Sequence, residues 1–387
     1  MNILIWIKRT TRIGEGRTCL PWYPEPNKNF DWLVTGASLW MLAGLFLDGW
    51  AHNNLATELE TFFTPWHAVL YSGFALAALV LGITYLANLR QGYHWFRALP
   101  LTYMLSLLGV IIFGLAGNLD FLWHAVFGFE EGVEALLSPS HLALASGGIL
   151  ITSSAVRSSL KNAKDDRNVG LSALFSWFIV VAVIMFFTQF ANLYAHPHVF
   201  SAPPTQADSH FWDVTLIAYV LFPTAILMGA ALFSLRHWDL PVGGLALLFS
   251  GNSFLMFFVN LDDASPHWPI LIGGLASGLL AEALYRTLRP AERGAHTQHV
   301  FAFLLATTYA LFPLVSLLAT RAMWWSIHMW LGISVLAGFL GLGLSTLSQP
   351  HPEPQKIENR PEFKRAKGAR DDRTTNEIIE TQYPAGI

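Results

Sequence analysis

Long apolar runs recur along the whole chain, and they constrain its fold more than any other feature. Residues 69–87 and 101–116 are examples, and each run approaches the roughly 20 apolar residues that an α-helix needs to cross a bilayer. Only 13% of the residues are charged, whereas soluble domains average about 25%. These features exclude a soluble enzyme with a membrane tether, and they predict an all-α, polytopic bundle of membrane helices.

Apolar segments of suitable length predict about ten transmembrane helices. They cover residues 31–50, 66–88, 100–123, 138–156, 170–192, 212–234, 241–260, 269–286, 299–319 and 323–346. The chain then divides into an N-terminal arm (1–30), a four-helix region (31–156), a region of about six spans (157–346) and a tail (347–387). The tail is charged and contains proline, which is typical of a disordered extension.

Positive charge falls on one side of this ten-span arrangement. The N-terminal arm, alternate turns and the tail carry 22 of the 23 Lys and Arg residues, and Arg321 is the exception. Lys and Arg near helix ends stay in the cytoplasm, so we expect both termini to be cytoplasmic in a bacterial-type inner membrane. No basic patch remains to favour nucleic acid as a partner. The single cysteine, Cys19, excludes an internal disulfide and a thiolate-rich metal cluster.

A polar motif occurs twice at the outer ends of the first four predicted helices. The two copies are Asp48, His52, Glu60 and His67, and Asp120, His124, Glu134 and His141. The Asp and the first His are offset by 72 residues between the copies, and the Glu and the closing His by 74. Each copy begins where one helix ends and finishes where the next begins, so this internal repeat predicts two helical hairpins.

The spacing within each copy predicts a metal site. An Asp and a His four residues apart share one face of a helix. The closing His follows a Thr-Pro or Ser-Pro pair, a pattern that starts a helix with the hydroxyl as N-cap. Three donors of one hairpin can therefore surround one ion, with Glu60 or Glu134 as a fourth donor or an outer partner. Helix capping alone would not require the two closing His residues.

Carboxylate and imidazole ligands together suit copper, zinc or iron. Copper is the preferred metal, and we expect the two hairpins to pack against each other and bring both triads to one cluster at the periplasmic face. The later outer connections hold a weaker second group of donors. Its members are His196, His198, Asp262, Asp263, His267 and His328. Their spacing is not repeated, and a hydrated loop with a few helix caps is the simpler interpretation.

The two hairpins resemble the C subunit of the copper membrane monooxygenases, the particulate methane and ammonia monooxygenases. The resemblance covers roughly residues 41–150 and rests on the Asp-x3-His and Thr/Ser-Pro-x-His elements of both copies. It implies that the two Asp-His-His triads are copper ligands at the outer side of the membrane. The second copy begins with Asp120, where the family has Asn, and the six later spans have no counterpart in that subunit.

The leading functional prediction is a copper-dependent membrane oxidoreductase of the monooxygenase type. It would act at the outer face on a small or apolar substrate, and a quinol, an electron-donor protein or further membrane subunits would supply electrons. One alternative is an intramembrane zinc hydrolase of a lipid amide or ester, with Glu60 or Glu134 as the base. Another is a metal transporter, although both motifs lie at one face and transport sites usually lie near the midplane.

Overall fold

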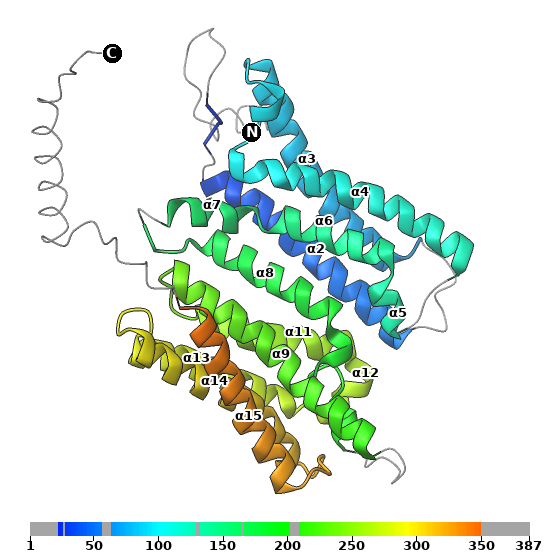
Figure 1. Cartoon of the computed structure of the whole chain (residues 1–387). Coiled ribbons are helices and arrows are strands. Elements are labelled where there is room, and N and C mark those ends of the chain that lie inside the picture. The colour runs from blue at the N-terminus through cyan, green and yellow to red at the C-terminus, as the bar shows by residue number, and fades with distance from the viewer. Residues whose placement is uncertain are drawn as a thin grey trace, which may run out of the picture. The chain divides into compact units, whose positions relative to one another are not determined.

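The computed structural model is helical throughout the part of the chain that it describes. It describes residues 22–25, 28–55, 63–128, 132–163, 166–201 and 209–349, and these ranges contain no β-strand. Figure 1 shows the long helices lying side by side. They are α2 (Lys28–Asn54), α3 (Pro65–Arg90), α4 (Leu101–Phe127), α9 (Ser209–His237), α13 (Ile270–Leu288), α14 (Ala295–Ala319) and α15 (Ile327–Leu347). Most of the predicted N-terminal arm and tail lies outside the described residues.

Six of the described helices, α2, α3, α4, α9, α14 and α15, are long and apolar enough to cross a membrane. A seventh crossing results if the pair Gly244–Val259 and Leu261–His267, which is bent by 106°, counts as one span. The other expected segments correspond to α13 and to the shorter helices α6 (Pro139–Thr152), α7 (Ser154–Asn162) and α8 (Leu171–Phe187). The chain therefore has the helices of an integral membrane protein, while the count of about ten spans stays a prediction.

Two predicted spans are broken where hydropathy shows no break. Residues 138–156 divide at Ser153, whose hydroxyl donates to the Ile149 carbonyl at 2.5 Å and ends the regular helix. Residues 241–260 contain α10 (Gly244–Ala246), a π-helical turn (Leu247–Gly251) and α11 (Asn252–Val259), and α12 (Leu261–Ala264) follows. π-Helical turns inside helices are rare and usually local. Apolar length alone therefore predicts neither break.

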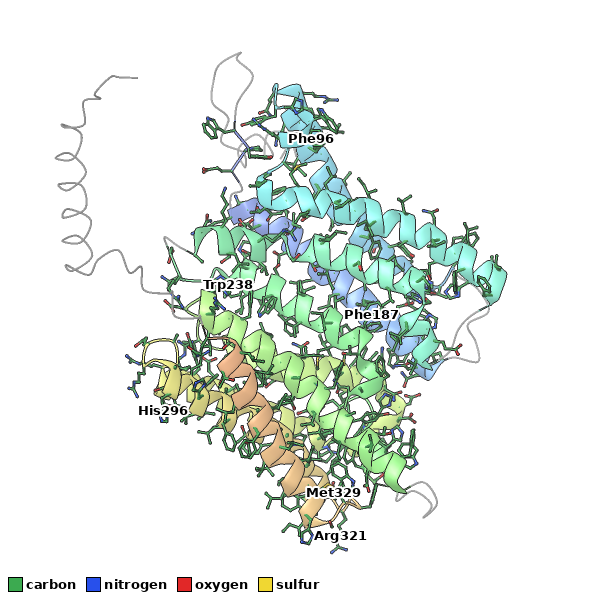
Figure 2. The ribbon with its side chains drawn as sticks, viewed as in Figure 1. Phe96, Phe187, Trp238, His296, Arg321 and Met329 are labelled. Atoms are coloured by element: carbon green, nitrogen blue, oxygen red, sulfur yellow. The ribbon has the colours of Figure 1, made fainter. Side chains whose placement is uncertain are left out.

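The connections that carry most of the basic residues lie toward one end of the helices. Figure 2 places Phe96, Trp238 and His296 on this side, and it places Arg321 and Met329 on the other. Phe96 and Trp238 belong to the turns that follow α3 and α9. The common location of these turns agrees with the charge pattern, and the membrane side that they face stays a prediction.

Glycines let four helices of the first region pack in close pairs, α2 with α3 and α4 with α6. A Cβ atom on Gly73 would lie 2.6 Å from the Met41 backbone nitrogen. A Cβ atom on Gly147 would lie 2.7 Å from the Phe113 backbone nitrogen. Only a hydrogen fits at either position, as at small-residue contacts between membrane helices. These two contacts are related by the same offsets of 74 and 72 residues as the polar motif.

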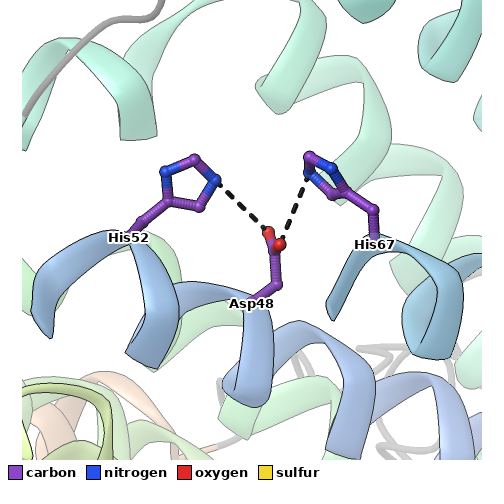
Figure 3. Close-up of side chains that lie close together, drawn as sticks. All are labelled: Asp48, His52 and His67. Atoms are coloured by element: carbon purple, nitrogen blue, oxygen red, sulfur yellow. Dashed lines mark ion pairs between the residues drawn. The ribbon is translucent and has the colours of Figure 1, made fainter. Parts of the chain in front are cut away.

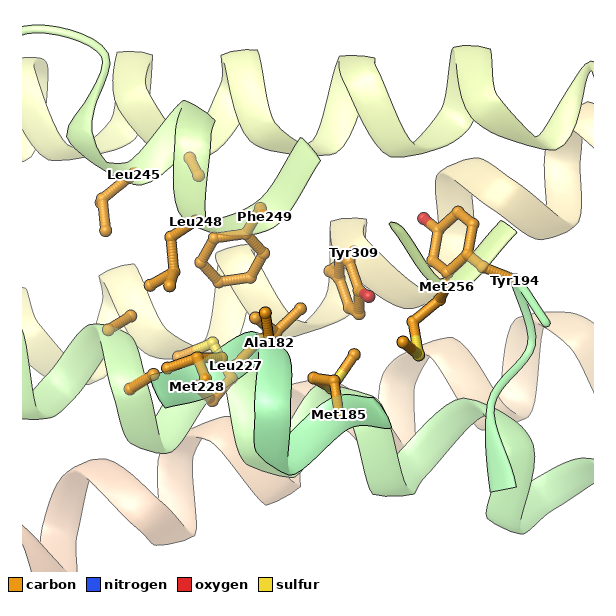
Figure 4. Close-up of a cluster of buried hydrophobic side chains, with 14 of the residues drawn as sticks. Ala182, Met185, Tyr194, Leu227, Met228, Leu245, Leu248, Phe249, Met256 and Tyr309 are labelled. Atoms are coloured by element: carbon orange, nitrogen blue, oxygen red, sulfur yellow. The ribbon is translucent and has the colours of Figure 1, made fainter. Parts of the chain in front are cut away.

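Helix α8 has two apolar faces and lies between the hairpins and the later helices. Figure 4 shows Ala182 and Met185 of α8 in a buried cluster with Leu227 and Met228 of α9 and Phe249 of the π-helical turn. Side chains three residues apart share one face of a helix, so this face of α8 belongs to the core of the second region. An adjacent face, which includes Phe186, lies against the first hairpin, where the Phe186 ring is 5.2 Å from the ring of Phe46 on α2.

Candidate metal centres

The first triad joins the end of α2 to the start of α3, as Figure 3 shows. Asp48 Oδ1 lies 3.4 Å from His67 Nε2, and Asp48 Oδ2 lies 3.9 Å from His52 Nε2. The Thr64 hydroxyl accepts a hydrogen bond from the His67 backbone N–H at 3.2 Å, so the predicted N-cap is confirmed. This cap fixes the first turn of α3 and thereby the position of His67 beside α2.

The second triad has the same construction at the end of α4 and the start of α6. Asp120 Oδ1 lies 3.3 Å from His141 Nε2 and 3.6 Å from His124 Nε2. The Ser138 hydroxyl caps α6 by accepting from the His141 backbone N–H. The two imidazole rings have centroids 5.7 Å apart and an interplanar angle of 57°, against 6.0 Å and 57° in the first triad. The predicted grouping of three donors is therefore present in both hairpins.

The donor atoms of each triad fit a metal ion. Within each group, one ligand atom per residue can be chosen so that all lie within 4.8 Å of one another. Asp48 Oδ1 and Asp120 Oδ1 are buried and accept no hydrogen bond within the described part of the chain. An unsatisfied buried carboxylate oxygen is costly, and a bound cation removes that cost. The cost without a cation is greatest at Asp120, whose side chain is only 2% exposed.

Hydrogen bonds behind the second triad orient its imidazoles. His124 Nδ1 lies 3.2 Å from the Gly128 carbonyl oxygen, which can only accept. This nitrogen therefore carries the proton, and Nε2 presents its lone pair to the site. His141 Nδ1 lies 2.8 Å from the Ser138 hydroxyl, so the residue that caps α6 also holds the ring. Such outer partners strengthen metal ligands and fix their orientation.

All six triad residues line one cavity with a volume of about 370 Å³. The helices α2, α3, α4, α6 and α8 all contribute to its wall. Much of the rest of the lining is apolar and includes Met41, Leu70, Phe113, Leu144, Ile179 and Phe186. The hairpins thus pack together as expected, but the triads remain two separate groups that face a common space.

Of the two predicted glutamate partners, the structure describes Glu134, and this residue does not join the second triad. Glu60 lies outside the described residues. Glu134 is exposed on the short helix α5 (Gly132–Leu137) and is not among the residues that line the cavity. The neighbours Ala135 and Leu136 line the cavity instead. The exposed side chain of Glu134 is therefore not part of the cavity that the triads line.

The second group of outer donors does not form a third triad among the described residues. His196 and His198 lie in the connection after α8, with ring centroids 6.0 Å apart, and Asn260 Nδ2 lies 3.3 Å from His196 Nδ1. Burial, reinforced by the neighbouring His198, lowers the pKa of His196 to about 4, so its imidazole is neutral at pH 7. The other members, Asp262, Asp263, His267 and His328, are exposed except for the partly buried His267.

Tyr71 is a cavity residue that the sequence reasoning missed. It follows His67 by four residues on α3, and the two rings have centroids 6.2 Å apart. Its four-residue spacing from His67 on a predicted helix indicates a shared helix face, and this signal could have identified it. The equivalent position in the second hairpin is Ala145, which also lines the cavity, so a search for repeated polar residues passes over Tyr71.

Comparisons with protein-family models, with curated proteins and with solved structures find no match to this chain. The resemblance of the hairpins to the copper monooxygenase C subunit therefore stays a prediction.

Proposed function

We propose that this chain is an integral membrane oxidoreductase that holds two copper ions, one in each Asp-His-His triad. The observation that carries the proposal is the presence of two triads of matching geometry in one largely apolar cavity. Imidazole and carboxylate ligands suit copper, and zinc and iron are the alternatives. We further propose that the two hairpins are copies of one unit, which the matching offsets of triads and glycine contacts support.

In the proposed reaction, an oxygen atom of O2 enters a C–H bond of a small or apolar substrate. A bound copper ion would supply the redox chemistry that activates oxygen. The other oxygen atom leaves as water, which requires two electrons and two protons. A quinol or an electron-donor protein would supply these electrons, and further membrane subunits are a second source.

The chain itself would position the metals and control access to them. The triads provide the ligands, while Ser138 and the Gly128 carbonyl hold two of the imidazoles. Apolar walls such as Leu70, Phe113 and Phe186 favour an apolar substrate and exclude water. The exposed faces of the hairpin helices are apolar and include Leu76 and Leu115, as is typical of helices that contact lipid. An apolar substrate dissolved in the bilayer would therefore need only a short path to the cavity.

The proposed topology completes this assignment. Ten crossings, with both termini in the cytoplasm of a bacterial-type inner membrane, place the triads at the periplasmic face. The support is the basic asymmetry of the sequence and the common end of the turns that carry it.

Elemental analysis of the purified full-length protein tests the proposal. Because the chain has two triads, we expect about two copper ions per chain. The variants His67→Ala and His141→Ala, which each disrupt one triad, should hold about one copper ion per chain. Copper-loaded protein should then consume oxygen with a quinol as electron donor and an alkane as substrate. Preparations that contain no transition metal under any loading condition would rule out the proposal.

The zinc hydrolase and the metal transporter remain the alternatives. The hydrolase needs a general base, and the exposed position of Glu134 outside the cavity lining disfavours that residue. Zinc without copper in carefully prepared protein would favour the hydrolase, whereas metal flux across proteoliposomes would favour the transporter.

A further inference from the structure

The cavity contains one phenol group between the two triads, and it belongs to Tyr71. Its ring lies beside His67 of the first triad, with centroids 6.2 Å apart, and 6.0 Å from the ring of Phe113 on α4. The side chain therefore leaves the first hairpin and reaches the helix that carries the second triad.

Gly117 receives the hydroxyl end of Tyr71. A Cβ atom on Gly117 would lie 2.9 Å from the Tyr71 hydroxyl oxygen, which is closer than real Cβ contacts. Gly117 precedes Asp120 by three residues on α4, so the two residues share one helix face. The hydroxyl consequently lies one turn from the second carboxylate, and it is within electrostatic range of both Asp120 and Asp48.

The second hairpin has no such group, because Ala145 occupies the position equivalent to Tyr71. Among the described residues that line the cavity, Tyr71 thus supplies a phenol to a space that two otherwise matched triads share. A phenol hydroxyl can donate one hydrogen bond, and an acceptor bound at either metal centre would lie in the same cavity as the Tyr71 ring.

We propose that Tyr71 is a positioning residue whose hydroxyl donates a hydrogen bond to a small anionic ligand bound at the metal centres. The inference rests on the proposed function, since the ligand is held by the metals of the triads. The class of ligand is a small anion with a nitrogen or oxygen lone pair, because such a ligand can both bind a metal ion and accept a hydrogen bond from the hydroxyl.

Azide titration of the copper-loaded, full-length protein tests this role. The azide-to-copper absorption band reports how much azide is bound. We expect azide to bind about tenfold more weakly to Tyr71→Phe, as for the loss of one hydrogen bond to a charged group. The copper content should not change. Gly117→Ala should weaken azide binding in the same direction, because the added methyl group displaces the hydroxyl without removing it.

Gly114→Ala is the matched control. It adds the same methyl group one turn earlier on α4, where the nearest atom would be Phe74 Cζ at an ordinary 3.6 Å. We expect wild-type azide affinity for this variant. Unchanged azide affinity in Tyr71→Phe with full copper content overturns the inference and leaves the proposed function intact. A wild-type protein that binds no copper overturns both.

Discussion

Asp120 Oδ1 lies 3.3 Å from His141 Nε2, although the two residues belong to different helices and the short helix α5 lies between them in the sequence. The contact joins the last two turns of α4 to the first turn of α6. Asp48 and His67 make the equivalent contact at 3.4 Å. A carboxylate between two imidazoles in each hairpin is the relationship on which the metal assignment depends.

Metal content should depend on the triad histidines and not on the other histidines of the chain. We expect His52→Ala, His67→Ala, His124→Ala and His141→Ala each to lower metal occupancy, because two remaining donors bind an ion far more weakly than three. The control His299→Ala should keep full occupancy, since His299 Nδ1 instead lies 2.7 Å from the Ser345 hydroxyl. Elemental analysis and thermal unfolding together separate metal loss from misfolding, and full occupancy in all four variants would contradict the assignment.

Asp120→Asn should have opposite effects with and without metal. At pH 8 with a chelator, the substitution removes an unsatisfied buried carboxylate and should stabilise the protein by about 1–3 kcal/mol. With metal, it should destabilise the protein, because a charged ligand is lost. Thermal unfolding in detergent measures both. Asp48→Asn should change the stability less than Asp120→Asn does, because the Asp48 side chain is more exposed. If Asp120→Asn is less stable than the wild type in chelator, the carboxylate is not one that requires a metal ion.

Ser138→Ala should weaken metal binding more than Ser138→Thr. The alanine variant loses both the cap of α6 and the hydroxyl 2.8 Å from His141 Nδ1. We expect about 1 kcal/mol less stability from the cap and about 10–100-fold weaker metal binding at the second triad from the lost outer partner. Threonine retains the hydroxyl, so Ser138→Thr should keep most of the wild-type stability and most of the wild-type metal affinity. A metal titration with wild-type affinity for Ser138→Ala would show that the serine only caps the helix.

Gly147→Ala should destabilise the second hairpin by about 1–3 kcal/mol, because its Cβ atom would lie 2.7 Å from the Phe113 backbone nitrogen. Gly73→Ala should do the same in the first hairpin, where the Met41 nitrogen is as close. Gly82→Ala is the control in α3, since no atom lies within 4 Å of its added Cβ, and it should be neutral or slightly stabilising. Unfolding in denaturant or by heat measures all three, and equal stability of the three variants would be evidence against close helix contact.

The topology can be tested with single cysteines in a Cys19→Ser background. Asn162→Cys and Glu292→Cys lie in connections that we assign to the cytoplasm. A membrane-impermeant maleimide added to intact spheroplasts should leave both unlabelled and should label them after lysis. A cysteine at Ser326, in the opposite connection, should react from outside. Labelling of position 162 or 292 from outside would invert the proposed orientation.

The sequence predicts the triads well because their geometry is local. Asp48 and His52 are one helical turn apart, and the cap at Thr64 sets the position of His67, so spacing alone brings the three donors together. Hydropathy cannot predict the break at Ser153 or the π-helical turn Leu247–Gly251, because it carries no information on local hydrogen bonding such as the bond from the Ser153 hydroxyl to the Ile149 carbonyl. It also gives no distances between helices. The shared cavity and the contact of Tyr71 with Gly117 depend on how the two hairpins pack.

The two faces of α8 have a mechanical consequence for the cavity. Ile179, Val183 and Phe186 form part of its wall, while Ala182 and Met185 on the same helix are embedded in the core of the later helices. Protein interiors are close-packed, so a helix held from behind transmits displacement and does not absorb it. A bulkier residue at Ala182 would push this shared partition toward the hairpins and shrink the chamber in front of the triads. Such a substitution, at a contact with the later helices, would therefore reduce the size of what the cavity admits, although all six triad residues belong to the hairpins.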